Sequence, residues 1–334
     1  MPISQPTQYQ ILDADQRLTN ISILQLNDPS VFVAGQMFPT VPVNLQAGKY
    51  VTYNSGDFNK TEMRATADGS PAPLAGWGKG EDSYFCETYK EATIIGPAAM
   101  ANATAPFDLL RDSTMMLTQH ALIHREKQFK SNYMKTGVWA VDKQGVASNP
   151  TGAQFIQWDD YTNSDPIGDV RASADALAVA NYGQRPNIFA ISRDVFSVLV
   201  EHPALIERII YIAGSEPARL SRQHLAALFE VDSVVVLDAV ENTANEGAAA
   251  TPSYIFQNEA FLAYRPSSPG LMTASPGYIF SWNYLSGFGG TAVRREERTM
   301  REGGGTYLEV ATSYDMKVVS DTLGTYWHSV ISSS

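Results

Sequence analysis

A polar stretch rich in glycine and proline separates two strand-like segments in the first third of the chain. The segments are Lys49–Tyr53 and Tyr84–Ile95, and the stretch between them contains Asp68–Pro71 and Gly76–Gly80. This pattern predicts a long hairpin. A two-stranded ribbon is only marginally stable in water, and so long a loop in a compact domain needs a functional explanation. The sequence therefore indicates that something outside the hairpin, most simply a neighbouring subunit, holds it in place.

The residues before the hairpin are expected to form an extended arm. Residues 1–46 are polar near the start, are interrupted by Pro29, Pro39 and Pro42, and carry apolar side chains without a clear helical or strand period. We therefore predict that this arm makes no hydrophobic core of its own.

One long helix is expected after the hairpin. Thr104-Ala105-Pro106 provides a capping residue and an early proline, and Gly137 provides a stop. About thirty helical residues would form a rod roughly 45 Å long. Apolar residues spread around much of the circumference, so we expect this helix to contact neighbours on several sides.

Residues 165–250 alternate between helix and strand patterns. A helix is expected from Asp165-Pro166 to Gly183, a strand over 187–191, and a second helix that Ser192 caps and His202-Pro203 ends. A helix over 221–229 and an apolar strand over 233–237 follow. These elements predict a compact α/β lobe.

The end of the chain is largely β. Strands are expected over 253–264, 278–284, 291–300 and 306–319. In the last of these, apolar residues from Leu308 to Val318 alternate with residues such as Glu309 and Lys317, which indicates a strand buried on one face only.

Composition narrows the possible functions. The chain has 334 residues, of which 44% are hydrophobic and 18% charged, so it should fold into two lobes or one large domain. Its net charge of -11 has the wrong sign for gripping nucleic acid through phosphates. Neither a signal peptide nor the run of about 20 apolar residues that spans a bilayer is apparent. The single cysteine, Cys86, excludes an intrachain disulfide.

The sequence gives little support to a catalytic function. A hydrolase could be assembled from Ser192, Asp194 and either His202 or His224, but no Gly-x-Ser-x-Gly elbow surrounds any serine. An α/β hydrolase therefore stays the least favoured alternative.

Other chemical motifs are equally weak. His120 and His124 have the spacing of two metal ligands on a helix, yet no third ligand is evident. Gly76–Gly80 lacks the spacing of a phosphate loop, and Cys86 lies among strand residues, where a packing role is simpler. We expect no enzyme activity, no cofactor and no metal.

A run of charged residues lies in the predicted strand over 291–300. Arg294, Arg295, Glu296, Glu297 and Arg298, with Arg301 beyond them, would charge both faces of that strand. Solvent is the simplest environment for them. A sharper hypothesis is that they form salt bridges between subunits, each contributing about 0.2–1 kcal/mol.

The order of these elements resembles that of the tailed-bacteriophage major capsid proteins, the Hong Kong 97-like fold. The most family-like residues are the helix-to-strand run Leu220–Val236, the Glu201-His202-Pro203 stop and the terminal Ser313–Val319. The resemblance spans nearly the whole chain and depends on the order and spacing of its segments.

The resemblance implies an α+β fold with five parts. They are an N-terminal arm (1–46), an extended β-hairpin loop (47–95), a peripheral domain with a spine helix (96–164), an α/β axial domain (165–250), and a return through the axial domain to the C-terminal strands of the peripheral domain (251–334). It also implies that the loop contacts a neighbour. The candidate intersubunit residues are Lys60, Arg64, Trp77, Lys79, Arg294, Arg295, Glu296, Glu297 and Arg298.

The implied function is self-assembly into an icosahedral shell that encloses double-stranded phage DNA without sequence-specific binding. The implied partners are other copies of the chain, in hexamers and pentamers, together with a scaffolding protein, a portal and a decoration protein; no membrane is involved. The implied location is the virion capsid, assembled in the cytoplasm of a host bacterium. An encapsulin-like compartment, which encloses enzymes, is the main alternative.

Overall fold

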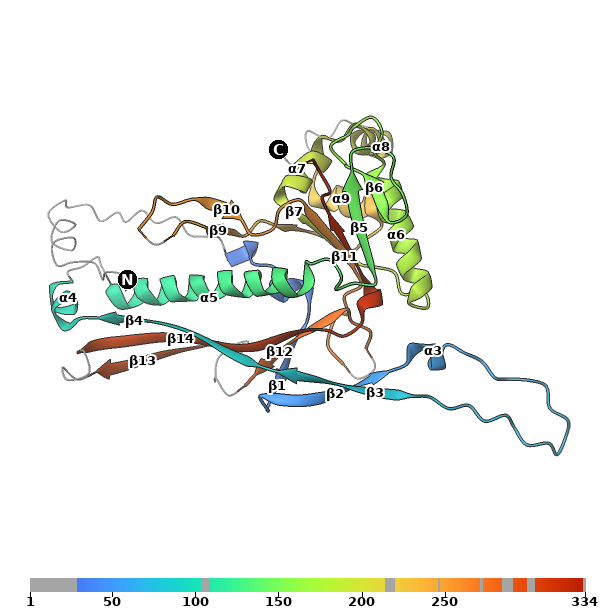
Figure 1. Cartoon of the computed structure of the whole chain (residues 1–334), viewed down its shortest axis with the longest axis horizontal. Helices are drawn as coiled ribbons and strands as arrows, with labels where there is room; N and C mark the ends of the chain where they lie inside the picture. Colours follow the sequence, from blue (N-terminus) through green and yellow to red (C-terminus); the bar gives the residue numbers. More distant parts are fainter. Residues whose placement is uncertain are drawn as a thin grey trace.

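The computed structural model describes residues 29–103, 108–213, 220–245, 247–270, 273–283, 291–298 and 304–332. Figure 1 shows three parts: a long twisted sheet with helix α5 lying along it, a lobe of helices around a second sheet, and a hairpin that leaves the body as a thin extension. The first 28 residues of the predicted arm lie outside the described residues.

The long sheet is organised around β14 (Gly305–Val318). Strand β4 (Glu87–Ile95) pairs along one edge of β14, and β13 (Thr291–Arg298) and β12 (Gly277–Trp282) follow one another along the other edge. Strand β1 (Thr40–Val43) adds to β12 in parallel. The predicted alternation holds from 305 to 310, but residues 310–314 are all buried. Ala311 and Ser313 are short side chains between flanking strands, so they expose little surface on the face expected to meet solvent.

Helix α5 (Leu109–Tyr133) covers one face of this sheet. The Asp108 side chain caps it by accepting hydrogen bonds from the backbone of Leu110 (3.1 Å) and Arg111 (3.2 Å). The predicted start at 104–107 lies outside the described residues, and the helix ends three residues before the predicted 136. The short helix α4 (Pro97–Asn102) precedes it.

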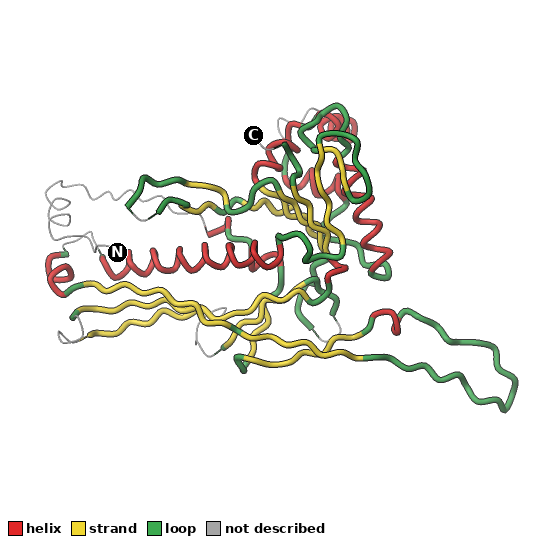
Figure 2. The backbone as a smooth tube through the Cα atoms, in the orientation of Figure 1, coloured by secondary structure: helices red, strands yellow, loops and turns green. Residues whose placement is uncertain are grey.

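The lobe contains a six-stranded mixed sheet, visible at the upper end of Figure 2. Its order is β6 (Gln154–Ile156), β5 (Val141–Val146), β15 (Gly324–His328), β11 (Glu259–Ala263), β7 (Ile188–Ser192) and β8 (Ser233–Leu237). Strands β7 and β8 confirm the predictions. The predicted strand 253–264 is wrong as a single element: β10 (Pro252–Tyr254) pairs with β9 (Val240–Asn242) in a separate hairpin, and β11 enters the lobe.

Four helices pack around the lobe sheet. Helices α6 (Pro166–Ala180), α7 (Arg193–Glu201) and α9 (Arg222–Phe229) lie where the sequence predicts them. Helix α8 (Pro203–Ala213) was not predicted. Pro203 ends α7 as expected, but it also occupies the first position of α8, where proline needs no backbone N–H.

The predicted extended conformation is wrong for part of the arm, and residues 32–38, which make no core of their own, join a core shared with α5 and the lobe. The 3-10 turn η1 (Pro29–Val31) leads into α2 (Ala34–Met37), and the side chains of Met37 and Phe38 are fully buried. The Phe38 ring packs 4.5 Å from Tyr133 and 6.0 Å from Phe261, measured between ring centroids. This segment therefore joins α5 to the lobe, although its apolar run is too short to show a period in the sequence.

The predicted hairpin is confirmed, with one correction to its second strand. Strands β2 (Ala47–Tyr53) and β3 (Lys79–Phe85) pair in antiparallel register, with α3 (Ser55–Phe58) after β2. The predicted strand 84–95 is two strands in different sheets, since the pairing partner changes from β2 to β14 at Cys86. Cys86 is fully buried, and its backbone N–H donates to Gln46 O (2.8 Å).

Candidate functional site

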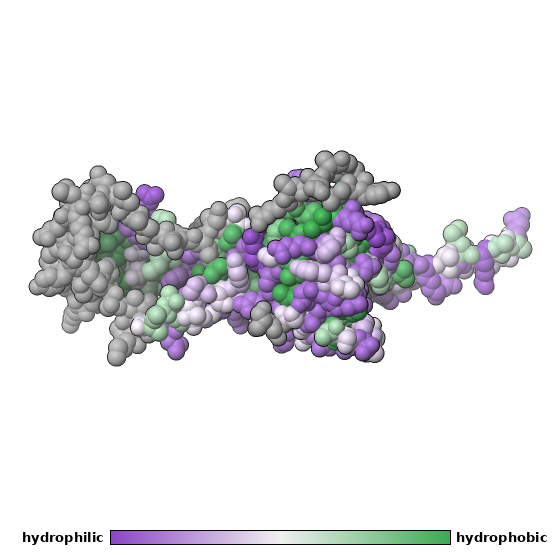
Figure 3. All heavy atoms as spheres, turned by 90° about the horizontal axis from the view of Figure 1, so that it is seen from above, coloured by the Kyte–Doolittle hydropathy of each residue, from purple (hydrophilic) through white to green (hydrophobic). Residues whose placement is uncertain are grey.

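The most exposed part of the described chain is the loop between β2 and β3. Nearly every residue from Phe58 to Gly80 is exposed, including Met63 at 92% and Leu74 at 96%. A tight turn closes the tip, with Gly69 at a φ of 80° and the Ser70 N–H donating to Ala67 O (3.0 Å). Figure 3 shows the loop as a thin tail of mostly hydrophilic residues with a few apolar ones. The two large apolar side chains bury almost none of their surface within this chain.

A small aromatic cluster closes the base of the loop. The Trp77 ring centroid lies 5.6 Å from Tyr53 and 5.8 Å from Phe58. The Asp57 carboxylate accepts a hydrogen bond from the Gly78 N–H (2.9 Å) across the loop. Trp77 nevertheless remains 57% exposed, so one side of the cluster faces solvent.

The hairpin is fixed to the body at its other end. The Tyr84 ring stacks on Phe280 of β12 at 4.7 Å, and the Asp315 carboxylate of β14 accepts a hydrogen bond from the Phe85 N–H (2.8 Å). Across the ribbon, the Tyr50 hydroxyl donates to Asp82 (2.8 Å), and burial raises the pKa of Tyr50 above its ordinary value. The hairpin thus has a firm base and an uncovered outer half.

The four candidate residues on the hairpin are all exposed. Lys60 pairs with its close neighbour Glu62 (2.5 Å), Arg64 lies further along the loop, and Lys79 begins β3 opposite Tyr53. The structure therefore brings Lys60, Arg64, Trp77 and Lys79 onto one projecting element.

The charged run lies on β13, at the opposite end of the molecule from the hairpin loop (Figure 1). Arg294 pairs in register with Glu309, Arg295 with Leu308 and Glu296 with Tyr307, while Glu297 and Arg298 continue to the end of the strand. Arg295 and Glu296 are exposed. The side chains of Arg294, Glu297 and Arg298 and all of Arg301 lie outside the described parts. The two candidate groups are thus separate surfaces and not one site.

A buried carboxylate missed in the sequence fastens the N-terminal segment to α5. Glu126 is 1% exposed, and its Oε1 accepts a hydrogen bond from the Ala34 N–H (2.8 Å) at the start of α2. Burial raises the pKa of Glu126 to about 7, although this hydrogen bond and Arg125 act in the opposite direction. The second oxygen, Oε2, has no hydrogen-bond partner among the described residues.

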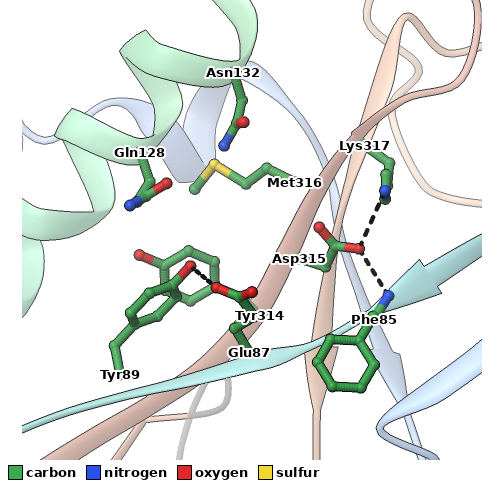
Figure 4. A pocket seen from close by; sticks show the side chains of 9 residues that line it. All are labelled: Phe85, Glu87, Tyr89, Gln128, Asn132, Tyr314, Asp315, Met316 and Lys317. Atoms are coloured by element: carbon green, nitrogen blue, oxygen red, sulfur yellow. Dashed lines mark hydrogen bonds and ion pairs between the residues drawn. The ribbon is translucent and has the colours of Figure 1, made fainter.

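A polar groove of about 300 Å³ lies between α5 and the strands below it (Figure 4). The side chains of Gln128 and Asn132 enter it from α5, and Asp315 bridges the Phe85 N–H and Lys317 on the opposite side. The Tyr89 hydroxyl donates to Glu87 (2.8 Å) at the near end. The groove holds no arrangement of nucleophile and base.

The hydrolase residues are not brought together. The fully buried Ser192 hydroxyl accepts a hydrogen bond from Glu259 N (3.2 Å), and Asp194 accepts one from Asn258 N (2.6 Å). His224 caps its own helix through Ser221. His202 contacts Ser164 instead (3.1 Å), a pair that the sequence did not suggest. The Ser164 hydroxyl donates to Asp160 O (2.6 Å), so its proton is not available to the imidazole.

The remaining motifs have structural partners. His120 contacts Glu91 (3.0 Å), and the His124 ring packs 4.5 Å from Tyr89, where burial lowers its pKa. Burial raises the pKa of the Cys86 thiol to about 11. Within the described ranges, no group of three or more His, Cys, Asp or Glu residues could hold a metal ion, and no helix is long and apolar enough to cross a membrane.

Comparison with known proteins relates this architecture to viral capsids. No family model matches the chain. A curated major capsid protein of Burkholderia phage BcepMu is 25% identical over 242 residues, which cover 68% of this chain and 69% of the relative. A crystal structure of a phage-related protein from Bordetella bronchiseptica superposes with a TM-score of 0.67 at 19% identity, covering 92% of this chain and 95% of the other. The capsid of cyanophage P-SCSP1u gives a TM-score of 0.58 at 9% identity, covering 92% and 90%.

The fold and the exposed hairpin define the class: this is a structural protein with the Hong Kong 97-like capsid fold, and not an enzyme. Within that class, the chain is similar to a curated phage major capsid protein over about two thirds of its length, and it shares its fold with several phage capsids.

Proposed function

We propose that copies of this chain, arranged in hexamers and pentamers, tile an icosahedral shell that encloses double-stranded phage DNA. The observation that carries the proposal is the loop from Asn59 to Gly78, which leaves the body and exposes Met63 and Leu74 at 92% and 96%. An apolar side chain gains roughly 1.5–3 kcal/mol when it is fully buried. A neighbouring subunit that covers these side chains would recover that free energy at every copy in the shell.

The loop and β13 are proposed to form two separate subunit contacts, each with a different neighbour. Lys60, Arg64, Trp77 and Lys79 would meet one neighbour, and Arg294, Arg295, Glu296, Glu297 and Arg298 would meet another. Support comes from the placement of the two groups at opposite ends of the molecule (Figure 1). Exposed ion pairs contribute little individually, so shell stability would depend on many repeated contacts.

The five-part division of the chain is part of the same proposal. The lobe within 165–250 would form the axial domain around the symmetry axes, and the sheet with α5 the peripheral domain. The return segment 251–334 serves both, because β11 and β15 lie in the lobe sheet while β12, β13 and β14 lie in the long sheet.

The net charge of -11 favours enclosure of DNA over tight binding to it. A scaffolding protein, a portal and a decoration protein are the partners that such a shell would use, with assembly in the host cytoplasm before the mature virion forms.

Removing the loop tests this function. Replacement of residues 60–76 by a short glycine-serine linker should leave a folded subunit, because the base contacts of Tyr84 and Asp315 remain, yet it should abolish closed shells in negative-stain electron microscopy. Normal particles from this variant would refute the proposal.

A matched pair of substitutions tests whether assembly requires burial of the apolar loop side chains, and not only the presence of the loop. Met63→Asp with Leu74→Asp should abolish shells. The control is Val179→Asp on α6, which changes another highly exposed apolar residue (82%) outside the loop and should assemble normally. Equal assembly of the two proteins would show that the loop side chains are not covered by a neighbour.

An encapsulin-like compartment is the second candidate. The SrpI encapsulin of Synechococcus elongatus superposes with a TM-score of 0.54 at 11% identity, close to the values for the phage capsids. Particles purified from the source would contain DNA in the first case and protein cargo in the second.

A further inference from the structure

One limb of the hairpin loop has the sequence pattern of a strand but no strand partner. From Lys60 to Ala67, the limb that follows α3 is extended (Figure 2), is exposed at every residue and pairs with no strand among the described residues. Charged residues at 60, 62 and 64 alternate with Thr61, Met63 and Ala65, which is the period of a strand with two different faces. The contact between Lys60 and Glu62 (2.5 Å) places two of the charges on the same side.

This limb can supply a regular set of backbone hydrogen bonds. It contains no proline, so every residue keeps its N–H group, whereas the returning limb contains Pro71 and Pro73. Within the described chain, the Met63 N–H bonds to the Thr61 hydroxyl (3.2 Å), and no backbone ladder forms along the limb. The limb therefore retains donors and acceptors that the edge of another sheet can pair with.

A free strand edge lies at the far end of the molecule. All 8 residues of β13 pair with β14 along one edge, and within the described ranges nothing pairs with the other edge. The side chains of Val293, Arg295 and Glu296 are exposed on this strand. Charges on an edge strand discourage pairing with unrelated strands, but they permit pairing with a strand of complementary charge.

One antiparallel register matches both faces of the two strands. If Lys60 lies opposite Glu296, charges of opposite sign meet on one face. Three residues further along, Met63 then lies opposite Val293 on the other face, and these side chains are 92% and 50% exposed in the single chain. Both opposite-charge pairs and apolar pairs directly across an antiparallel ladder stabilise a sheet.

Val293 lies at the rim of an apolar cluster that already exists in the fold. Its partner in register is Val310 of β14, which is buried together with Leu308 and Leu117. Directly opposed residues share one face of a sheet, so Val293 extends this cluster toward the free edge of β13. A methionine placed beside it, as Met63 would be in this register, covers the part of Val293 that is exposed.

The limb and β13 of one chain cannot pair with each other, because they lie at opposite ends of the molecule (Figure 1). Two unlike surfaces at opposite ends suit a heterologous contact, in which each copy gives one surface to one neighbour and the other surface to a second neighbour.

We propose that residues 60–65 of one copy add to the free edge of β13 in the next copy as an antiparallel strand. Lys60 lies opposite Glu296 in this contact, and Met63 lies opposite Val293. The inference rests on the proposed self-assembly, and it names the surface of the neighbour that the loop contacts.

Disulfide trapping tests this register in the full-length chain. One protein carries Met63→Cys and a second carries Val293→Cys; they are mixed before assembly, and both the particles and concentrated free subunits are mildly oxidised. Opposed residues lie close enough for a disulfide, and the native Cys86 gives little background because it is fully buried. The matched control mixes Leu74→Cys with Val293→Cys, since Leu74 is 96% exposed on the other limb of the same loop.

We expect a covalent dimer whose cross-linked peptide joins positions 63 and 293, and at least about fivefold less of the dimer from the control mixture. A chain that carries both Met63→Cys and Val293→Cys should form a ladder of covalent oligomers, because each copy then links to two neighbours. Absence of the dimer in both particles and free subunits, or equal yields from the two mixtures, would overturn the pairing.

Exchange of charges tests the other face of the same register. Lys60→Glu is added to the Met63→Cys protein and Glu296→Lys to the Val293→Cys protein. Either change alone opposes like charges and should slow the disulfide at least about threefold, whereas the two together should restore its rate. Because Lys60 also contacts Glu62 in its own chain, the measured quantity is the coupling in this double-mutant cycle. A coupling of zero would refute the register.

Failure of the pairing and failure of the shell have different signatures. Closed wild-type particles in negative-stain electron microscopy, without a link between positions 63 and 293 in the cysteine proteins, would retain the shell and refute the pairing. A link between free subunits that never build closed particles would retain the pairing and refute the shell.

Discussion

Replacing Glu126 by glutamine should remove a pH dependence from the stability of this protein. The carboxyl group is buried between α5 and α2, and burial raises its pKa from 4.5 to about 7. A group whose pKa is raised in the folded state stabilises the fold fully below its unfolded pKa, and that contribution is lost as the pH rises through the folded value. The relevant window is therefore pH 4.5 to 7.

The magnitude follows from the shift. A difference of about 2.5 pKa units, at about 1.4 kcal/mol per unit, corresponds to roughly 3 kcal/mol between pH 4.5 and pH 8. Glutamine keeps an oxygen that can accept the Ala34 N–H and cannot ionise, so it resembles the protonated acid. Glu126→Gln should therefore match the wild type near pH 5 and be more stable by about 3 kcal/mol at pH 8.

Urea unfolding of free subunits at pH 5, 6, 7 and 8 measures this difference. Other titrating groups, including Glu259 and His202, are common to both proteins, so their contributions cancel in the comparison. The control is Val179→Ala on α6, which changes an exposed apolar residue and removes no titratable group, so its difference from the wild type should stay constant with pH. If the curves of wild type and Glu126→Gln run parallel across this range, the burial argument is refuted.

Three further outcomes are expected. Phe38→Ala should lower the free energy of unfolding by about 3–5 kcal/mol, whereas Phe58→Ala, at a side chain 48% exposed, should cost far less in the same denaturant titration. Cys86 should react with a thiol reagent at pH 8 only after unfolding, because it is buried and its pKa is raised to about 11; fast labelling of the native chain would contradict this. Asp108→Ala should cost about 1 kcal/mol in thermal unfolding through loss of the α5 cap, and Asp108→Asn should restore most of it.

The elements that carry local signals could be predicted from the sequence. Helix α6 has a capping Asp165 and a proline at its first position, α9 has the Ser221 cap, and β8 is a short apolar run. Their boundaries lie within a few residues of the predictions because short-range hydrogen bonding and periodicity determine them.

The missed elements depend on contacts distant in the chain. Strand β15 lies between β5 and β11, yet Gly324–His328 contains too few residues for a visible alternation. The burial of Phe38 requires Phe129, Tyr133 and Phe261 from three distant segments. The Glu126 contact to Ala34 likewise spans 92 residues, and a lone glutamate within a helix gives no signal of burial.

The candidate contact residues on the loop and on the charged strand were predicted as one group. The sequence could not show that these two sets of residues lie far apart in space. Trp77 was predicted as an exposed contact, and the structure adds its packing against Tyr53 and Phe58. No spacing in the sequence places the hairpin and β13 at opposite ends of the molecule. That relation comes from the length of β14, which carries β4 on one edge and β13 on the other.

The direct passage from β3 into β4 determines how the chain bears mechanical load. Only Cys86 separates the two strands, so tension applied to the loop travels along one extended backbone into the ladder of nine residue pairs between β4 and β14. That tension acts parallel to the strands, and the ladder must then yield by shear, with many hydrogen bonds stretched together. A hairpin attached through a flexible turn would separate from its sheet one hydrogen bond at a time. The direct connection of β3 to β4 should therefore make this hairpin resistant to tension along its strands.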